Sequence, residues 1–129
     1  MEQNIRILIL EDRTSDAALI NFELTEAGLH YTHLWVVNEK EYLRALEGFS
    51  PDLILSDYDL PQYSGALALA AARKRLPQVP FILITGALND DPERVGEFLA
   101  NGASDYVLKD RLDQLVPVVH SALGCRRSA

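Results

Sequence analysis

The sequence predicts an α/β fold: a single doubly wound (βα)5 domain built on a five-stranded parallel sheet. Five short apolar runs rich in β-branched residues alternate with five longer segments in which apolar residues recur at helical spacing. This alternation is typical of a parallel sheet covered by helices on both faces. Right-handed crossovers then favour the strand order 2-1-3-4-5, one of the common orders for such sheets.

The first half of the chain supplies three of these strands and two helices. Strands are predicted at residues 5–10, 31–37 and 52–57. The first helix is expected to begin at Thr14 or Ser15 and to end before Gly28, because glycine favours the left-handed backbone that closes a helix. Asn38 followed by Glu41 resembles a capping box, which predicts that a second, short helix begins there.

The second half continues the alternation. Strands are predicted at residues 81–84 and 104–108, and helices at 66–76, from 92 to about 101, and from 110 or 111 to about 123. Asp91 followed by Pro92 has the form of an N-cap with proline at the first helical position. Residues 1–124 are expected to form the domain and residues 125–129 a short tail.

Composition narrows the possible functions. The chain has 129 residues, which suits one domain, and its net charge of −7 argues against binding nucleic acid or an anionic membrane through bulk charge. The lone cysteine, Cys125, cannot form an internal disulfide, as expected of a cytosolic protein. No run approaches the roughly 18 apolar residues of a membrane-spanning helix, and the first run is too short for a signal peptide. We therefore expect a soluble cytoplasmic protein without direct nucleic-acid binding.

Five chemically active side chains follow the predicted strands at their carboxyl ends. They are Glu11 and Asp12 after strand one, Asp57 after strand three, Thr85 after strand four and Lys109 after strand five. In a doubly wound sheet, ligands bind outside the carboxyl ends of the strands. We therefore expect three acids, one hydroxyl and one lysine from distant parts of the chain to meet at one sheet edge.

Three crowded carboxylates predict a cation site. At about 4 Å and an effective dielectric constant near 20, each like-charged pair costs roughly 4 kcal/mol, so the cluster needs a cation, a shared proton or a lysine. All the candidate ligands are oxygens, which favours Mg²⁺. With a cation present, Asp57 stays ionised and can attack phosphorus, while Lys109 offsets charge on a transferring phosphoryl group and Thr85 donates to one of its oxygens.

Four motifs together resemble the receiver domains of two-component signalling. They are Glu11-Asp12, the stretch from Asp57 to Gly65, Thr85-Gly86-Ala87 and the stretch from Tyr106 to Lys109. Each motif is weak alone, but the set, with this order and spacing, is specific. The resemblance covers about residues 4–123 and implies a flavodoxin-like fold.

The resemblance implies a role for each matching position. Asp57 would be the phosphoacceptor, Glu11 and Asp12 the metal-binding acids, and the Asp59 carbonyl a further Mg²⁺ ligand. Lys109 would pair with the phosphoryl group, and Thr85 and Tyr106 would be the switch residues. The phosphoryl group would come from a histidine kinase or a histidine phosphotransfer protein. A face formed by helix four, strand five and helix five would then change shape and signal to an unidentified protein partner.

Three positions depart from the usual family pattern. Many receivers have a proline after the lysine, joined by a cis peptide bond, whereas here Lys109 precedes Asp110, and a cis bond there would cost about 2.5–4 kcal/mol. Asp59 adds an acid at a variable position linked to dephosphorylation rate, and Arg13 follows the acidic pair. We hypothesise that Arg13 and Asp59 face each other across the mouth of the site and gate access to the phosphoryl group.

Other interpretations of these residues remain open. Glu11-Asp12 could cap the first helix, and Asp57, Thr85, Lys109 or Tyr106 taken singly could each be structural. Asp57-x-Asp59 has the Asp-x-Asp form of a haloacid-dehalogenase-like phosphatase, although that motif normally continues to threonine or valine. A flavodoxin-like cofactor binder should have Thr, Ser and Gly where the acidic pair stands. A pseudo-receiver that serves only as an interaction module is the third alternative.

Overall fold

The fold is a five-stranded parallel sheet between two helical layers, as predicted. The computed structural model describes residues 4–60, 62–86 and 92–127. The central strands are β1 (Ile5–Leu10), β2 (Tyr31–Val36), β3 (Leu53–Asp57), β6 (Phe81–Thr85) and β7 (Asp105–Leu108), and the α-helices are α1 (Thr14–Glu26), α2 (Glu39–Gly48), α3 (Gly65–Arg75), α4 (Pro92–Ala100) and α5 (Leu115–Arg127). The sheet order is β2-β1-β3-β6-β7, which is the predicted 2-1-3-4-5 counted over these five strands.

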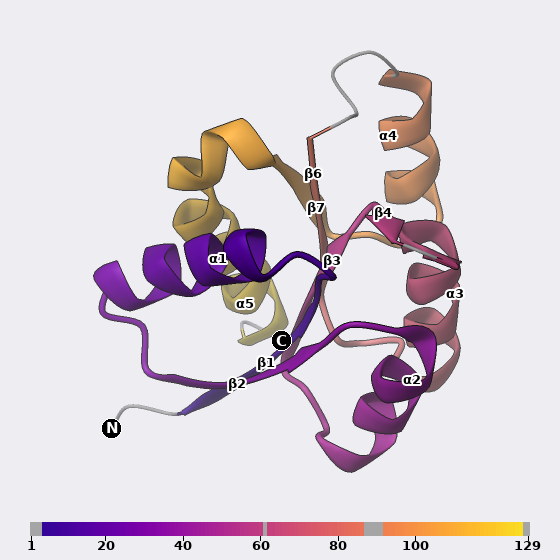
Figure 1. Cartoon of the computed structure of the whole chain (residues 1–129), viewed down its shortest axis with the longest axis horizontal. Helices are drawn as coiled ribbons and strands as arrows, with labels where there is room; N and C mark the ends of the chain where they lie inside the picture. The colour runs from indigo at the N-terminus through magenta and orange to yellow at the C-terminus, as the bar shows by residue number, and fades with distance from the viewer. Residues whose placement is uncertain (1–3, 61, 87–91, 128–129) are drawn as a thin grey trace.

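Alternate residues of the central strands belong to two hydrophobic cores, one on each face of the sheet. Helices α1 and α5 cover one face of the sheet, and α2, α3 and α4 cover the other (Figure 1). Along β1, Ile7 and Ile9 belong to the core beneath α1 and α5, whereas Leu8 and Leu10 belong to the opposite core. Because β1 is buried on both faces, its sequence is almost continuously apolar. The two cores fix the strand ends relative to one another.

Several predicted helix boundaries are confirmed by their caps. Asn38 accepts a hydrogen bond from the Glu41 backbone N–H at 2.9 Å and opens α2. Gly28 follows Ala27, the C-cap of α1, and has φ of 75°, a conformation that glycine adopts at little cost. The N-cap of α1 is Arg13, without a side-chain cap, so Asp12 does not cap this helix. The predicted N-cap Asp91 lies outside the described residues, and α4 begins at Pro92 as expected.

The segment after β7 differs from the prediction. Residues Lys109–Gln114 form a 3₁₀ helix, η2, interrupted at Arg111 (φ −131°, ψ 46°), and α5 begins only at Leu115. Pro117 explains the difference, because proline is tolerated in the first turn of a helix but would clash in the interior of a helix that began at residue 110. Helix α5 also continues through Arg127, into the segment expected to be a tail. The Lys109–Asp110 peptide bond is trans.

A second difference lies between β3 and α3, where the sequence predicted only a loop. Strands β4 (Asp59–Leu60) and β5 (Tyr63–Ser64) form a small antiparallel hairpin. Ser64 then accepts a hydrogen bond from the Leu67 N–H at 3.1 Å and caps α3. The hairpin brings the start of α3 back to the end of β3, since the Gly65 N–H donates to the Tyr58 carbonyl at 2.9 Å.

Gly65 is required by this close approach, which gives a first prediction. A Cβ at this position would lie 3.1 Å from the Asp57 carbonyl oxygen, the Tyr58 Cα and a Leu83 methyl carbon. We expect Gly65→Ala to lower the free energy of unfolding by about 1–3 kcal/mol, measured by urea denaturation. Gly96→Ala is the matched control: nothing lies within 4 Å of a Cβ there, so helix propensity should stabilise it by up to about 1 kcal/mol. Equal effects of the two variants would refute the steric explanation.

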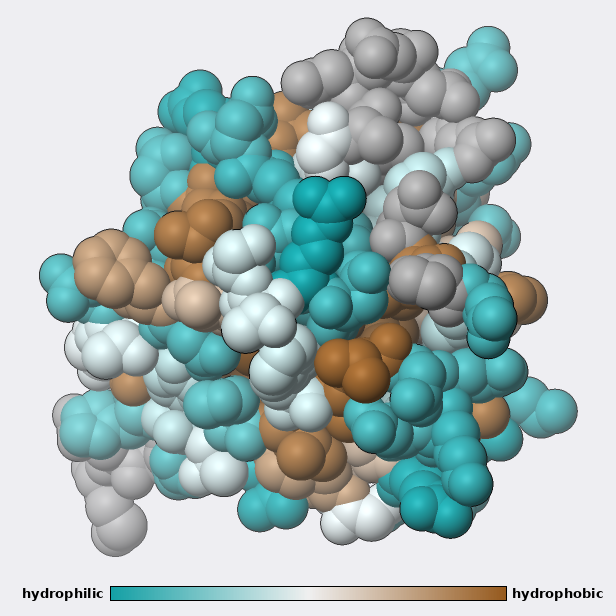
Figure 2. All heavy atoms as spheres, in the orientation of Figure 1, coloured by the Kyte–Doolittle hydropathy of each residue, from teal (hydrophilic) through white to brown (hydrophobic). Residues whose placement is uncertain are grey.

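The outer surface is mixed in character. On the face shown in Figure 2, apolar side chains reach the surface in separate places among hydrophilic ones. Large exposed apolar residues include Leu19 and Phe22 on α1 and Leu34 and Trp35 on β2. Among the helices of the described residues, none has the length and apolar character needed to cross a membrane.

Candidate functional site

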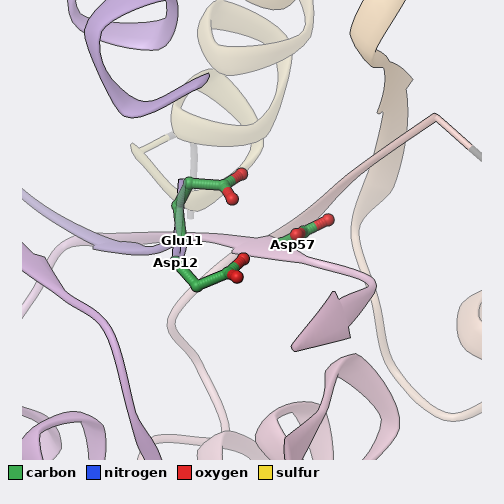
Figure 3. Close-up of side chains that lie close together, drawn as sticks. All are labelled: Glu11, Asp12 and Asp57. Atoms are coloured by element: carbon green, nitrogen blue, oxygen red, sulfur yellow. The ribbon is translucent and has the colours of Figure 1, made fainter. Parts of the chain in front are cut away.

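The predicted acids meet at the carboxyl end of the sheet. Glu11 and Asp12 follow β1 and Asp57 ends β3, two strands that are neighbours in the sheet. One carboxylate oxygen from each of the three lies within 4.8 Å of the others. Figure 3 shows the side chains of Glu11 and Asp12 turned toward that of Asp57. Sequence reasoning therefore placed the three acids of this cluster correctly.

Asp57 is held by hydrogen bonds with the residues on either side of it. Its side chain is only 8% exposed, and its Oδ1 accepts a hydrogen bond from the Tyr58 N–H at 2.8 Å. The Ser56 hydroxyl donates to the Asp57 carbonyl at 2.9 Å. The Asp57 Oδ2 lies 3.4 Å from the Lys109 Nζ. One carboxylate oxygen is thus tied to the backbone, and the other faces the charged centre of the site.

Lys109 is surrounded by three carboxylates. Its Nζ lies 2.8 Å from an Asp16 oxygen, 3.1 Å from a Glu11 oxygen and 3.4 Å from the Asp57 oxygen. Burial opposes the charged form, but the hydrogen bond to Asp16 and the charges of Asp57 and Glu11 outweigh it, so the pKa of Lys109 is raised. The lysine is therefore a permanent cation beside the acids, as predicted.

Glu11 is a buried acid whose pKa is strongly shifted. Its side chain is 1% exposed, and this burial, followed by the negative charge of Asp57, raises its pKa to about 7. A hydrogen bond from the Arg13 N–H at 3.1 Å and the nearby Lys109 oppose the shift without cancelling it. Near neutral pH and without a bound cation, both the protonated and the ionised form of Glu11 are therefore populated.

The raised pKa of Glu11 predicts a pH dependence of stability. The pKa of Glu11 in the folded protein, about 7, exceeds the ordinary glutamate value of 4.5, so the stabilising contribution of the protonated form is complete below pH 4.5 and is lost as the pH rises to about 7. In EDTA, the free energy of unfolding of Glu11→Gln relative to the unsubstituted protein should therefore increase between pH 5 and pH 8. Urea denaturation at the two values measures it. A difference that stays constant over this range would contradict the assignment.

The carboxylate cluster fits a hard divalent cation. Its donors are all oxygens, they lie close enough to share one ion, and the charge of Asp57 contributes, after burial, to the raised pKa of Glu11. Mg²⁺ favours such carboxylate oxygens and usually retains several waters. The donor set is therefore chemically suited to the predicted cation.

The remaining predicted residues occupy different positions relative to this cluster. Thr85 is buried at the end of β6, one residue beyond the partner of Asp57 in the sheet register. Tyr106 lies on β7 opposite Leu83 and is 37% exposed, outside the acid cluster. Arg13 is exposed at the start of α1. The Asp59 side chain lies outside the described residues, so the Arg13–Asp59 gate stays a prediction.

Two residues of the site were missed by sequence reasoning. Asp16, in the first turn of α1, makes the shortest contact with Lys109. The sequence feature that could have indicated Asp16 is its position four residues after Asp12, close to the acidic pair. Trp35, on the edge strand β2, donates from its indole Nε1 to the Glu11 carbonyl at 2.6 Å. A tryptophan in a strand carries no sequence signal for such a contact.

The family of the chain follows from comparison with known proteins. Residues 7–120 match the family model described as the response regulator receiver domain. The chain belongs to this family. The match includes most of β1, all of the other four central strands and the three clustered acids, so the receiver resemblance seen in the four sequence motifs is confirmed.

Full-length relatives of this receiver domain are much longer. The chain is 30% identical to the DNA-binding transcriptional regulator NtrC of Escherichia coli K12 and 31% identical to the luminescence regulatory protein LuxO of Vibrio campbellii, over 92% and 89% of its length. It spans only 24% and 25% of these two proteins. The likeness therefore concerns one domain of each relative.

Solved structures share the fold of this receiver domain. The signal receiver domain of a putative LuxO repressor from Vibrio parahaemolyticus gives a TM-score of 0.86 at 24% identity, covering 97% of this chain and 94% of that one. The receiver domain of the sensor histidine kinase PA1611 from Pseudomonas aeruginosa gives 0.80 at 25% identity, covering 95% and 99%. The latter structure has a magnesium ion coordinated in its active-site cleft.

Proposed function

We propose that this receiver domain accepts a phosphoryl group on Asp57, with Mg²⁺, from a phosphohistidine of a histidine kinase or phosphotransfer protein. The observation that carries the proposal is the meeting of Asp57 with Glu11, Asp12 and Lys109 at one end of the sheet. Family membership supports it, as does the magnesium ion in the related PA1611 receiver.

The charges of the site suit phosphoryl transfer. Glu11, Asp12 and Asp57 would hold Mg²⁺, together with the Asp59 carbonyl, and the bound ion would offset negative charge on the phosphoryl oxygens. An Asp57 carboxylate oxygen attacks phosphorus, the bond from phosphorus to the histidine nitrogen breaks, and the imidazole keeps the electron pair. Lys109 pairs with the added charge, and the Thr85 hydroxyl donates to a phosphoryl oxygen.

The proposed output is a change of shape on the face formed by α4, β7 and α5. Thr85 and Tyr106 lie on the neighbouring strands β6 and β7. Strand β6 pairs with β3, which carries Asp57, and β7 belongs to this face. A shift of Thr85 toward the phosphoryl group would leave room for the half-exposed Tyr106 ring to turn inward. The signal would pass to a protein partner, and the domain would act as a signalling phosphoacceptor rather than as an enzyme with turnover.

Incubation with acetyl phosphate tests the phosphoacceptor function. Intact-protein mass spectrometry should show one added phosphoryl group per chain in Mg²⁺ and none in EDTA, and hydroxylamine should remove it, as expected of an acyl phosphate. An unlabelled protein would favour an interaction-only module. Steady hydrolysis of p-nitrophenyl phosphate would instead favour the phosphatase suggested by Asp57-x-Asp59.

A further inference from the structure

Asp16 stands apart from the three acids that would hold a cation. It projects from the first turn of α1, whereas the clustered carboxylates come from the ends of β1 and β3. In the site it accepts a hydrogen bond from Lys109, 93 residues away in sequence, at 2.8 Å. Both side chains are 22% exposed, so solvent screens this ion pair only in part. The contact ties α1 directly to the residue that follows β7.

Lys109 has three N–H donors, and three carboxylates surround them. Asp16 is the nearest of the three acids, ahead of Glu11 and Asp57. A phosphoryl group on Asp57 would therefore share the ammonium with an acid that is already in hydrogen-bond contact. A lysine ammonium is a compact point charge, so each additional anion beside it weakens its attraction for the next. Asp16 thus acts against a bound anion.

Asp16 has the opposite effect on a cation in the site, because it favours the binding of the cation. The Lys109 ammonium lies 3.1 Å from Glu11 and 3.4 Å from Asp57, two of the acids that would hold the cation, and therefore repels it. A carboxylate that contacts Lys109 without holding the cation offsets part of that repulsion. Asp16 is such a carboxylate, since it contacts Lys109 without belonging to the clustered acids.

We propose that Asp16 is a positioning residue that partly neutralises Lys109 and so shifts the site's preference toward the cation and away from the phosphoryl group. The inference rests on the proposed phosphoacceptor function. A site with Asp16 binds Mg²⁺ more tightly and holds its phosphoryl group less tightly than the same site without it. The residue acts through Lys109 and does not contact the reacting atoms.

The test compares Asp16→Asn with the unsubstituted protein in two titrations. Calorimetry measures Mg²⁺ affinity, and a second titration with beryllofluoride at saturating Mg²⁺ measures affinity for a phosphoryl mimic. We expect Mg²⁺ affinity to fall about fivefold and beryllofluoride affinity to rise about fivefold, the size expected of a partly exposed ion pair. Loss of folding would lower both affinities, so opposite signs distinguish the proposed role from a structural one. Two affinities that stay unchanged or move together would overturn it.

Three further variants make the test specific to Lys109. Asp16→Glu, which keeps the charge, should restore both affinities at least in part, and Glu26→Gln, at the far end of the same helix, should change neither. In a Lys109→Met background, Asp16→Asn should have a much smaller effect on Mg²⁺ affinity. If Asp16→Asn lowered Mg²⁺ affinity equally in that background, Asp16 would act on the cation directly through its charge and not through Lys109, which would refute the proposal. If the unsubstituted protein bound no beryllofluoride, the proposed phosphoacceptor function would be contradicted. The Mg²⁺ titrations would still test the effect of Asp16 on cation affinity.

Discussion

Asp57→Asn is expected to abolish phosphoryl incorporation and, at the same time, to stabilise the folded protein in the absence of Mg²⁺. The amide is not a nucleophile, so no acyl phosphate can form, yet its oxygen can still accept the hydrogen bond from the Tyr58 N–H. Removing the Asp57 charge also removes the second cause of the raised pKa of Glu11. Because one pKa unit corresponds to about 1.4 kcal/mol, we expect a gain of about 1 kcal/mol at pH 8.

Mass spectrometry after acetyl phosphate treatment and urea denaturation in EDTA measure the two effects. Asp105→Asn is a matched control, because the Asp105 Oδ1 also accepts a hydrogen bond from the N–H of the next residue, at 2.8 Å, but lies at the start of β7. It should leave both quantities unchanged. Labelling of the Asp57→Asn variant to the level of the unsubstituted protein would contradict the proposed role of Asp57 as the phosphoacceptor.

Lys109→Met is expected to give the second-largest effect. Without the ammonium, phosphorylation by acetyl phosphate should slow by about 10²–10³-fold, the scale found when one group that stabilises transition-state charge is removed. Three acids also lose their shared counter-charge. We therefore expect the protein in EDTA to lose about 2–3 kcal/mol of stability, somewhat below the loss for a fully buried pair.

Mg²⁺ should counteract the loss of stability in Lys109→Met. The cation compensates the same carboxylates and no longer meets a repelling ammonium, so its affinity should rise in this variant. Labelling kinetics, urea denaturation with and without Mg²⁺, and calorimetry provide the three readouts. Lys40→Met on α2, an exposed residue, serves as the control. A Lys109→Met protein that binds Mg²⁺ less tightly than the unsubstituted protein would contradict this electrostatic account of the site.

The sheet and the acid cluster were predictable because they follow from patterns with strong physical constraints. Strands buried on both faces must be apolar almost throughout, and β1 and β3 show this. Parallel strands bring their carboxyl ends to one edge, so the position of Asp57 relative to Glu11 followed from topology alone. Lys109 was predictable for the same reason, since it directly follows the last strand.

The parts that sequence reasoning missed depend on contacts between distant segments. Asp16 reads as an ordinary first-turn acid of a helix until α1 and the residue after β7 are placed side by side. The late start of α5 had a readable signal in Pro117, but helical periodicity extends through the 3₁₀ segment and masked it. The β4–β5 hairpin has strands of two residues each, which are too short to show a period.

The hydrogen bond from Trp35 to the Glu11 carbonyl makes the chain its own optical probe. Trp35 is the only tryptophan in the sequence, so the entire indole emission comes from one ring attached to the loop that carries Glu11 and Asp12. Adding Mg²⁺ should change that emission, and Asp12→Asn should weaken the response at the same Mg²⁺ concentration. Occupancy of the carboxylate cluster could then be followed in real time, without a label, during treatment with acetyl phosphate.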